Sequence, residues 1–394
     1  MKKIFFLLIL LSLFFSYYGQ STIEFEKEWV ISGEPSKINF TGIFLLNTTE
    51  QRVVEVEVDP PLKIISDGDR LLAYYYGDFD GYEIFRARAK VINYYEPRIE
   101  NDPQIVPFGP QSTPLTAYDD EMAKTAISLT NSSSLASAVA LSNFVHKNMV
   151  YDISYSGKNI PAKVVFKRKE GVCAEYTHLF ISLANSIGLE TRYVGGYALT
   201  DKPLNIWQPH AWAQVKVGNK WISFDPTFAE GGVLTSSRVA VSYGKDADEI
   251  YDKIQSGKKI ELETRASIEL INESMRDDNV SIFLSFDEQN KVILIKLENP
   301  TSYFAVGTYR LLLPDNYGGE QKKVILLAPF SAYEEKVELN GNFADGFVYH
   351  IPIEVKFNDN TYSKEIVIEK KTKLDKSCAS ALIFLTLIFL VRSR

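Results

Sequence analysis

The sequence predicts an α+β protein in which a domain of helices packed on an antiparallel sheet lies between two β-sandwich domains. After Cys173, apolar residues repeat with the period of an amphipathic helix. Further along, two alternating runs meet at Gly218-Asn219, which suits a two-residue hairpin turn. On both sides of this region, alternating apolar and polar runs are separated by glycine, aspartate and proline, a pattern typical of sandwiches.

The length of 394 residues suggests two or three domains. We expect a β-rich N-terminal domain over residues 21–108 and a central domain over residues 109–258, with a last helix over residues 246–254. Residues 97–114 are proline-rich and are expected to form a linker or a strap. Residues 259–372 alternate again, as in an immunoglobulin-like sandwich, whose simplest role is that of a spacer.

The helix that follows Cys173 places this cysteine in its first turn. One face of the helix is apolar and consists of Tyr176, Leu179, Phe180, Leu183, Ala184 and Ile187. Gly171 marks the turn into the helix, and Gly188 is expected to end it. Unpaired N–H groups and the positive end of the helix dipole favour a thiolate at this position. A backbone N–H of the same turn could also stabilise an oxyanion.

The alternative is a buried cysteine that only packs, as free cysteines often do. The chain has two cysteines, and the other, Cys378, lies at the edge of an apolar C-terminal segment. A disulfide framework is therefore not expected, and a solitary thiol in an exported domain favours a chemical role for Cys173.

The predicted hairpin brings a histidine and an aspartate to one face of the sheet. With a two-residue turn, Val217 faces Lys220, and counting back places Trp212 opposite Asp225. His210 then lies on the same face as Asp225, about 7–8 Å away at the backbone, within reach of long side chains. The alternative is an ordinary hairpin on whose polar face the two residues coincide.

Together the three residues can form a nucleophile, its base and the group that orients the base. We expect Asp225 to hold one imidazole nitrogen of His210, while the other nitrogen faces the sulfur of Cys173. Tyr176, Trp207 and Trp212 either line the cleft or pack in the core.

The other three histidines are expected to be structural. His178 is predicted to be a partly exposed helix residue, His146 belongs to an upstream helical segment, and His350 lies in a distant β region. No pair of Cys or His residues has the spacing of metal ligands, and no H-E-x-x-H motif occurs. We therefore expect neither a metal nor a cofactor.

Several blocks of this region form a recognisable set. They are Gly171-Val172-Cys173-Ala174-Glu175-Tyr176, the run from Ser186-Ile187-Gly188 to Gly195-Gly196-Tyr197, His210-Ala211-Trp212, Trp221, and Asp225-Pro226-Thr227. Together these blocks resemble the transglutaminase-like superfamily. The resemblance implies a papain-like α+β core over the central domain, residues 109–258. It also implies catalytic roles for Cys173 as nucleophile, His210 as general base and acid, and Asp225 as the orienting group. The superfamily includes amide hydrolases, crosslinking acyl transferases and members with no demonstrated activity.

Both ends of the chain are apolar. Lys2-Lys3 and the run over residues 4–15 predict a signal peptide over residues 1–20, with an uncleaved anchor as the alternative. The apolar segment over residues 377–392 is followed by basic residues, which fits a membrane anchor with the body of the protein outside. The alternatives for this segment are a sorting signal that is cut or lipidated, and a buried C-terminal helix. We expect the protein on the extracellular face of the cell membrane.

Composition agrees with export and excludes some partners. The net charge is −7, so the chain lacks the basic footprint of a nucleic-acid-binding protein. An apolar fraction of 45% and an aromatic fraction of 13% exclude a disordered chain. Glycosylation sequons begin at Asn39, Asn47, Asn131, Asn272 and Asn279.

The sequence thus favours an exported, surface-attached cysteine enzyme that acts on amide bonds of a protein or peptide substrate through an acyl-enzyme. Peptidase or amidase activity and acyl transfer to an amine are both open. The alternative is a catalytically silent surface protein that uses the central domain as a scaffold for binding or structure.

Overall fold

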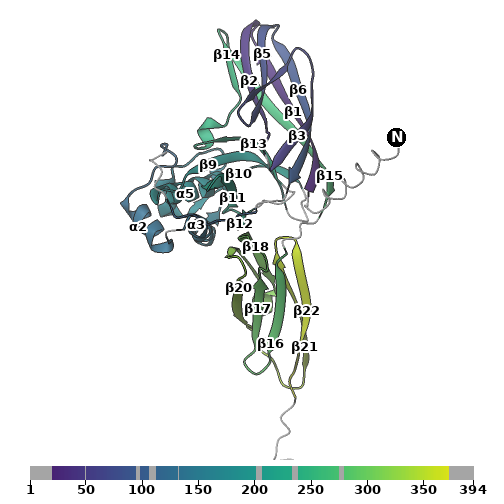
Figure 1. Cartoon of the computed structure of the whole chain (residues 1–394). Coiled ribbons are helices and arrows are strands. Elements are labelled where there is room, and N and C mark those ends of the chain that lie inside the picture. The colour runs from purple at the N-terminus through teal and green to yellow at the C-terminus, as the bar shows by residue number, and fades with distance from the viewer. Residues whose placement is uncertain are drawn as a thin grey trace, which may run out of the picture.

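The structure is a computed structural model, and it describes residues 20–371 except 49, 95–97, 106–111, 132, 201–205, 233–237 and 275–278. The described residues form an N-terminal β-sandwich, a central domain of helices on a sheet, and a C-terminal β-sandwich (Figure 1). The signal peptide expected over residues 1–20 and the attachment segment expected over residues 377–392 lie outside the described residues, apart from Gln20, which begins the first strand.

The N-terminal sandwich consists of two four-stranded antiparallel sheets. One has the order β15-β1-β6-β3, with bounds Ile260–Glu273, Gln20–Gly33, Tyr82–Tyr94 and Gln51–Val58. The other has the order β14-β2-β5-β4, with bounds Lys253–Ser256, Ser36–Leu46, Arg70–Phe79 and Lys63–Asp67. Alternate residues face inward, and aromatic side chains such as Trp29 and Phe40 fill the space between the sheets.

Two strands from beyond the central domain complete the N-terminal sandwich. β15 pairs with β1 over its whole length, from Ser21 opposite Glu273 to Gly33 opposite Ile260, and β14 pairs with β2. The last sandwich therefore does not begin at residue 259, as the sequence led us to expect, because residues 253–273 belong to the first one. Period-2 alternation identifies a strand but does not show which sheet it joins, and the partner here lies far away in the sequence.

Asp252 fixes the point at which the chain returns to the N-terminal sandwich. Its carboxylate accepts hydrogen bonds from the N–H of Ile43 at 2.6 Å and from the hydroxyl of Thr264 at 2.9 Å. It also pairs at 3.3 Å with the ammonium of Lys27, whose pKa is lowered by burial and partly restored by this carboxylate. The helix expected over residues 246–254 does not form, because the chain extends here to reach β2. The segment holds only the 3-10 turn η2 (Ala247–Glu249) and the start of β14.

The central domain is inserted between β6 and β14. Its antiparallel sheet has the order β12-β11-β10-β9-β13, with bounds Glu230–Gly232, Lys220–Asp225, Trp207–Val217, Thr191–Leu199 and Arg238–Gly244. The helices are α2 (Asp120–Leu129), α3 (Ser134–Asn148), α4 (Ala162–Arg168) and α5 (Cys173–Ser186). The 3-10 turn η1 (Ile153–Tyr155) follows β7 (Val150–Tyr151), which pairs in parallel with β8 (Glu170–Gly171). The predicted α+β class, with the cysteine helix packed on an antiparallel sheet, is confirmed.

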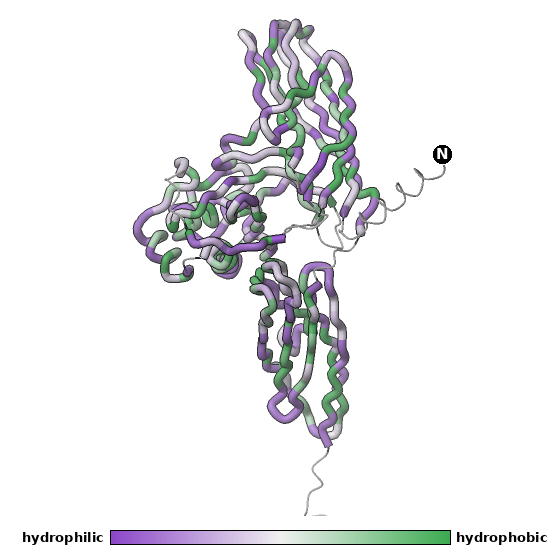
Figure 2. Tube along the Cα trace, viewed as in Figure 1, coloured by the Kyte–Doolittle hydropathy of each residue, from purple (hydrophilic) through white to green (hydrophobic). Residues whose placement is uncertain are grey.

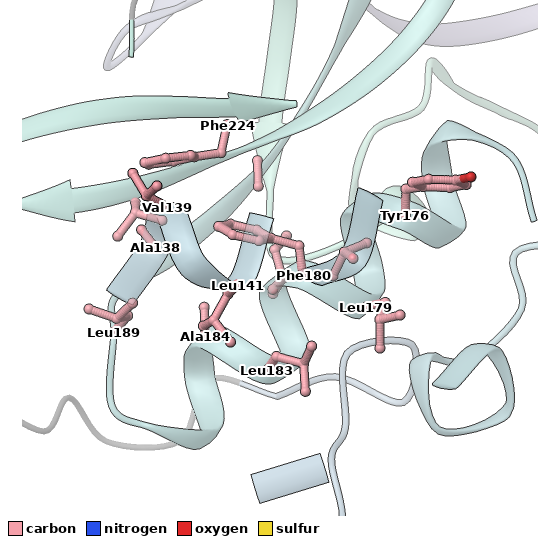
Figure 3. Close-up of a cluster of buried hydrophobic side chains, with 14 of the residues drawn as sticks. Ala138, Val139, Leu141, Tyr176, Leu179, Phe180, Leu183, Ala184, Leu189 and Phe224 are labelled. Atoms are coloured by element: carbon pink, nitrogen blue, oxygen red, sulfur yellow. The ribbon is translucent and has the colours of Figure 1, made fainter. Parts of the chain in front are cut away.

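An apolar core holds α5 against the sheet. The ring of Phe180 points from the helix toward the sheet and stacks on Phe224 of β11, with centroids 5.7 Å apart (Figure 3). Leu183 is fully buried in the same cluster, and Gly188, with φ of 91°, ends the helix as predicted. Because nearly all of α5 is buried, tight packing fixes the position of Cys173 at its start.

The C-terminal sandwich packs a three-stranded sheet on a four-stranded one. The first has the order β16-β17-β20, with bounds Ser281–Asp287, Val292–Glu298 and Ala332–Glu338. The second has the order β19-β18-β21-β22, with bounds Glu320–Leu327, Ala305–Leu312, Val348–Phe357 and Asn360–Glu369, and the 3-10 turn η3 (Asp315–Tyr317) joins β18 to β19. Apolar and polar residues alternate along the strands (Figure 2), and the inward apolar side chains form one buried cluster.

The C-terminal sandwich is packed directly on the central domain. The side-chain amide of Asn143 on α3 donates to the carbonyl of Val324 at 2.8 Å and accepts from its N–H at 2.9 Å. Val306 and Val324 lie in the same apolar cluster as α5. Gly232 has φ of 89°, and a Cβ atom there would collide with the carbonyl of Val306. A loosely tethered spacer would not share a core with its neighbour in this way.

The N-terminal sandwich holds β13, the edge strand of the central sheet. The side-chain amide of Gln51 donates to the carbonyl of Ala240 and accepts from its N–H, both at 2.7 Å. Asn93 donates through Nδ2 to the carbonyl of Arg238 at 2.9 Å. Within the expected strap, Ile99 is buried and bridges to Phe304 of the C-terminal sandwich. Over the described part of the chain, no helix is long and apolar enough to cross a membrane.

Candidate active site

Cys173 is the first residue of α5, as the sequence predicts. Glu175 fixes this helix start, because its carboxylate accepts hydrogen bonds from the N–H of Val172 at 3.0 Å and of Ile160 at 2.9 Å. Gly171 is required because a Cβ atom there would collide with the side chain of Glu175. The thiol of Cys173 is free and partly exposed, so it can meet a bound molecule.

The hairpin of β10 and β11 has the register that the sequence predicts. Val217 faces Lys220, and the pairing continues along the strands without a shift. Gly218 has φ of 59°, the positive value that the first position of a type II′ turn needs. This register places His210 and Asp225 on one face of the ladder.

His210 and Asp225 form a buried pair. Nε2 of His210 lies 2.6 Å from Oδ2 of Asp225, and the two residues are 9% and 0% exposed. Cys173 lies close enough to the imidazole to raise its pKa. Because Asp225 engages Nε2, Nδ1 is the nitrogen that can exchange a proton with the sulfur. The structure thus brings together the three residues that the sequence singles out.

Opposing effects set the charges of this pair. Burial lowers the pKa of His210, but the charge and hydrogen bond of Asp225, together with hydrogen bonding to Cys173, raise it to about 9. Burial raises the pKa of Asp225, but the neighbouring His210 and Arg238 hold it well below its usual range. Near neutral pH the site therefore holds an imidazolium beside a carboxylate.

Further groups hold Asp225, and sequence reasoning missed them. Nη2 of Arg238 donates to Oδ2 at 2.9 Å, and the N–H of Thr227 donates to Oδ1 at 3.1 Å, so both carboxylate oxygens are engaged. The ring of Phe228 lies against His210, with centroids 5.0 Å apart. Thr227 belongs to the Asp-Pro-Thr block that the sequence shows. Arg238 comes from the edge strand β13, and no spacing in the sequence links it to the site.

His178 is fully buried, which corrects the expectation of a partly exposed residue. The η2 turn covers it, and the N–H of Ala247 donates to its Nε2 at 3.2 Å. The ring of Tyr193 lies 5.2 Å away. Burial lowers the pKa of His178 to about 4, although Asp246 and Asp248 act in the opposite direction. The helical period showed on which helix His178 lies but not that the later turn would cover it.

The remaining two histidines each contact one oxygen atom of another residue. Nδ1 of His146 lies 3.1 Å from the carbonyl oxygen of Pro226, and Nδ1 of His350 lies 3.1 Å from the carboxylate of Glu365. In the part of the chain that the structure describes, no three His, Cys, Asp or Glu side chains are grouped so that they could hold a metal ion.

The aromatic residues considered for the cleft pack inside the protein. Tyr176 and Trp212 are almost fully buried. Trp212 contacts Leu46 and Val194 between the central domain and the N-terminal sandwich. Trp207 packs against the core of the same sandwich. All three side chains contribute to core packing, but Trp207 is only partly buried, and the ring of Trp212 also stacks on His210, with centroids 6.2 Å apart.

Three exposed apolar residues, Val150, Tyr151 and Ile153, lie in or just after β7, the strand that pairs with the residues preceding Cys173. Each of the three residues is more than half exposed, at 65%, 52% and 70%. Tyr151 pairs with Gly171 in the β7–β8 ladder, just before Cys173 in the chain. Burial raises the pKa of Tyr151, and the charge of the nearby Cys173 raises it further. The phenol of Tyr151 is therefore close enough to the sulfur to interact with it electrostatically. The ring of Tyr151 can therefore contact an apolar group of a molecule bound at Cys173.

Comparison with known proteins confirms the family resemblance of the central domain. Residues 121–226 match the model of the transglutaminase-like superfamily, and this span includes Cys173, His210 and Asp225. An uncharacterized protein of Mycobacterium leprae is 25% identical over 149 residues, which are 36% of this chain and 50% of that protein. Uncharacterized proteins of Mycobacterium bovis and Mycobacterium tuberculosis are 31% identical over 93 residues, which are 21% of this chain and 29% of each protein. The chain thus spans half or less of the length of these relatives.

One solved structure, described as that of a "putative cysteine protease" from Cytophaga hutchinsonii, is similar to this chain with a TM-score of 0.49 and 18% sequence identity. The similarity covers 66% of this chain and 94% of that one.

Proposed function

We propose that this chain, whose central domain has a transglutaminase-like core, is a cysteine enzyme that acts on amide bonds through an acyl-enzyme. The observation that carries the proposal is the buried imidazole of His210, which binds Asp225 at 2.6 Å and reaches Cys173. An imidazolium beside a thiol at a helix N-terminus supplies both a nucleophile and a proton donor.

In the proposed reaction, the sulfur of Cys173 attacks the carbonyl carbon of a carboxamide or peptide bond. Negative charge develops on the carbonyl oxygen, and the N–H of Cys173 can donate to it, since the first position of a helix has no carbonyl partner within the helix. His210 gives its proton to the leaving amine as the C–N bond breaks, which leaves a thioester. Water or a second amine then gives a proton to His210, attacks the thioester and releases the sulfur.

Asp225 supports both proton transfers. It is bound by the N–H of Thr227 at 3.1 Å and by His210, so the carboxylate cannot rotate away without losing buried hydrogen bonds. It therefore keeps the ring of His210 oriented and stabilises the imidazolium.

The exposed Tyr151, with Val150 and Ile153 close to it in the sequence, suits a protein or peptide substrate. Apolar side chains that are this exposed beside a reactive group can bury part of their surface against a side chain of the substrate. The choice between water and an amine as the second nucleophile decides between hydrolysis and acyl transfer.

We also propose that the enzyme acts on the outer face of the cell membrane. Lys2-Lys3 and the apolar run over residues 4–15 support export, and the apolar segment over residues 377–392 with its basic end supports attachment. Proteolysis of intact cells that express the full chain with a C-terminal tag tests this placement. External protease should remove the catalytic domain, and full protection of the domain would contradict the proposal.

The activity is tested by incubating the full chain with a glutamine-containing protein, with and without a labelled amine. Incorporation of the amine shows transfer, whereas release of ammonia or of new peptide N-termini shows hydrolysis. Cys173→Ala should abolish either reaction, and Cys378→Ala, the matched control, should leave it unchanged. Normal turnover by Cys173→Ala would overturn the assignment. Absence of both reactions, together with an unreactive thiol, would favour the silent surface protein.

A further inference from the structure

A chain of alternating charges runs from the C-terminal sandwich to the catalytic imidazole. Nζ of Lys322 on β19 lies 3.1 Å from Oε1 of Glu230. The other oxygen of Glu230, Oε2, lies 2.7 Å from Nη2 of Arg238. The same Nη2 donates to Oδ2 of Asp225 at 2.9 Å, and this oxygen also binds His210. We call Lys322, Glu230 and Arg238 the charge chain.

We propose that the charge chain positions Asp225 and tunes how strongly it binds the imidazolium of His210, so that the C-terminal sandwich is part of the catalytic unit. This inference rests on the proposed function. The sequence suggested only a spacer role for that sandwich, and the geometry points to Lys322 as its contribution to the site.

The burial of the charge chain requires that its charges be paired. The side chain of Arg238 is 6% exposed, and those of Glu230 and Lys322 are 17% and 19% exposed. A buried charge that loses its partner is strongly destabilising, so each member constrains the next. Arg238 also lies over the ring of Phe228 at 5.2 Å, and that ring packs against His210.

Arg238 and His210 share a single carboxylate oxygen, so they compete for it. The stronger the bond from Arg238 to Asp225, the weaker is the hold of Asp225 on the imidazolium, and the positive charge of Arg238 itself opposes the charge on His210. Glu230 limits this competition by drawing the guanidinium toward itself. Lys322 in turn partly neutralises Glu230.

The docking of the C-terminal sandwich places Lys322 at this point. Val324, two residues further along β19, is bound on both its backbone groups by Asn143 of α3. Lys323, the neighbour of Lys322, instead binds Glu335 of β20 at 2.6 Å within the sandwich. Lys323 is therefore a matched control, because its loss breaks an ion pair on the same strand outside the charge chain.

The test is the pKa of His210 in the full chain, measured by NMR of histidine-labelled protein with His210→Gln to assign the signal. The groups facing this ring are Asp225, Cys173 and Arg238. The measurement does not need turnover. The two proposals can therefore fail separately. An unreactive Cys173 would contradict the proposed enzyme function, whereas the directions in which the pKa of His210 changes test the role of the charge chain.

The expected changes differ in sign along the charge chain. Lys322→Met should raise the pKa of His210, because Glu230 then holds Arg238 more firmly and a positive charge is lost. Glu230→Gln should lower it, because the carboxylate that draws the charge of Arg238 away from Asp225 is then lost. Arg238→Met should raise it most, to about 1 or more above wild type, on the scale of a charge placed a few ångströms away. In Lys322→Arg and Arg238→Lys the pKa of His210 should stay close to the wild-type value, and in Lys323→Met it should be unchanged.

The opposite signs for Lys322→Met and Glu230→Gln separate tuning from loss of structure, which would move both variants in one direction. If neither variant changes the pKa of His210, or both change it in the same direction, the inference is wrong and the C-terminal sandwich only supports the fold. Should Arg238→Met fail to fold, the variants at the more exposed Lys322 and Glu230 still decide whether the charge chain tunes His210.

Discussion

Nε2 of His210 lies 2.6 Å from Oδ2 of Asp225, although the two residues are 15 positions apart in the chain. A tight turn and the alternation of side chains along two strands create this contact. A turn longer or shorter by one residue would place the two side chains on opposite faces of the sheet. Ordinary hairpin geometry therefore builds the pair, and the attraction between its two charged groups, acting against burial, gives it its unusual charge state.

Asp225→Asn should preserve the fold but remove most of the activity. The amide has the size of the carboxylate but no charge. The pKa of His210 should therefore fall from about 9, and the remaining effect of burial should take it below its ordinary value of 6.5. We expect kcat to fall by about a thousandfold or more, the scale seen when an orienting carboxylate is lost. Assays of amide turnover, with circular dichroism as the control for folding, test this. Activity within a few-fold of wild type would mean that Asp225 does not orient the base.

Turnover should decline as the pH rises through about 9. His210 must be protonated to give a proton to the leaving amine. Burial lowers the pKa of His210, but the Asp225 carboxylate outweighs this effect and holds that pKa at about 9. The measurement is kcat against pH from 6 to 10.5 at saturating substrate. A profile that already falls near pH 6.5 would show that the imidazole has an ordinary proton affinity and that Asp225 does not stabilise the imidazolium in the working enzyme.

Two buried histidines should act on stability in opposite pH ranges. The pKa of His178 is about 4 in the folded chain and 6.5 in the unfolded one, so the unfolded chain binds the extra proton between these values. The free energy of unfolding should therefore fall as the pH drops from 6.5 to 4. His210 has a pKa of about 9 in the folded chain. Its contribution to the free energy of unfolding is therefore complete below pH 6.5 and is lost as the pH rises to 9.

Urea unfolding of the His178→Gln and His210→Gln variants at pH 4.5, 7 and 9.5 tests this account. His178→Gln should flatten the loss of stability on the acid side, and His210→Gln should flatten the loss on the alkaline side. Each variant serves as the control for the other. If both keep the wild-type dependence on pH, the two histidines are not buried as the structure describes.

Asn143→Ala should weaken the attachment of the C-terminal sandwich. The substitution removes both hydrogen bonds to Val324 and leaves its backbone groups without their partner. We expect the free energy of unfolding to fall by about 1–3 kcal/mol, and limited proteolysis to cut between the domains more readily. Asn148→Ala on the same helix is the control, because Asn148 binds only the carbonyl of Phe144 within α3. Equal stability of the two variants would show that the hydrogen bonds of Asn143 to Val324 do not hold the C-terminal sandwich in place.

The sequence could predict the site wherever local periodicity and turn geometry decide the structure. The position of Cys173 follows from a helical period and its glycine boundaries, and the pairing of His210 with Asp225 follows from an even-length turn. Contacts between distant segments lie outside such reasoning. Arg238 reaches Asp225 through the edge strand β13, and β15 returns to β1 across the whole central domain. A strand pattern carries no information about its partner, so the extent of the first sandwich could not be predicted.

The most direct test of the account is the rate at which iodoacetamide alkylates Cys173 at pH 6, in wild type and in His210→Gln. An ordinary thiol is almost fully protonated at this pH, whereas a thiolate beside the imidazolium reacts quickly. We expect wild type to be alkylated about tenfold faster or more than His210→Gln, with mass spectrometry identifying the modified residue. Equal, slow rates in both proteins would contradict the central claim that His210 activates Cys173.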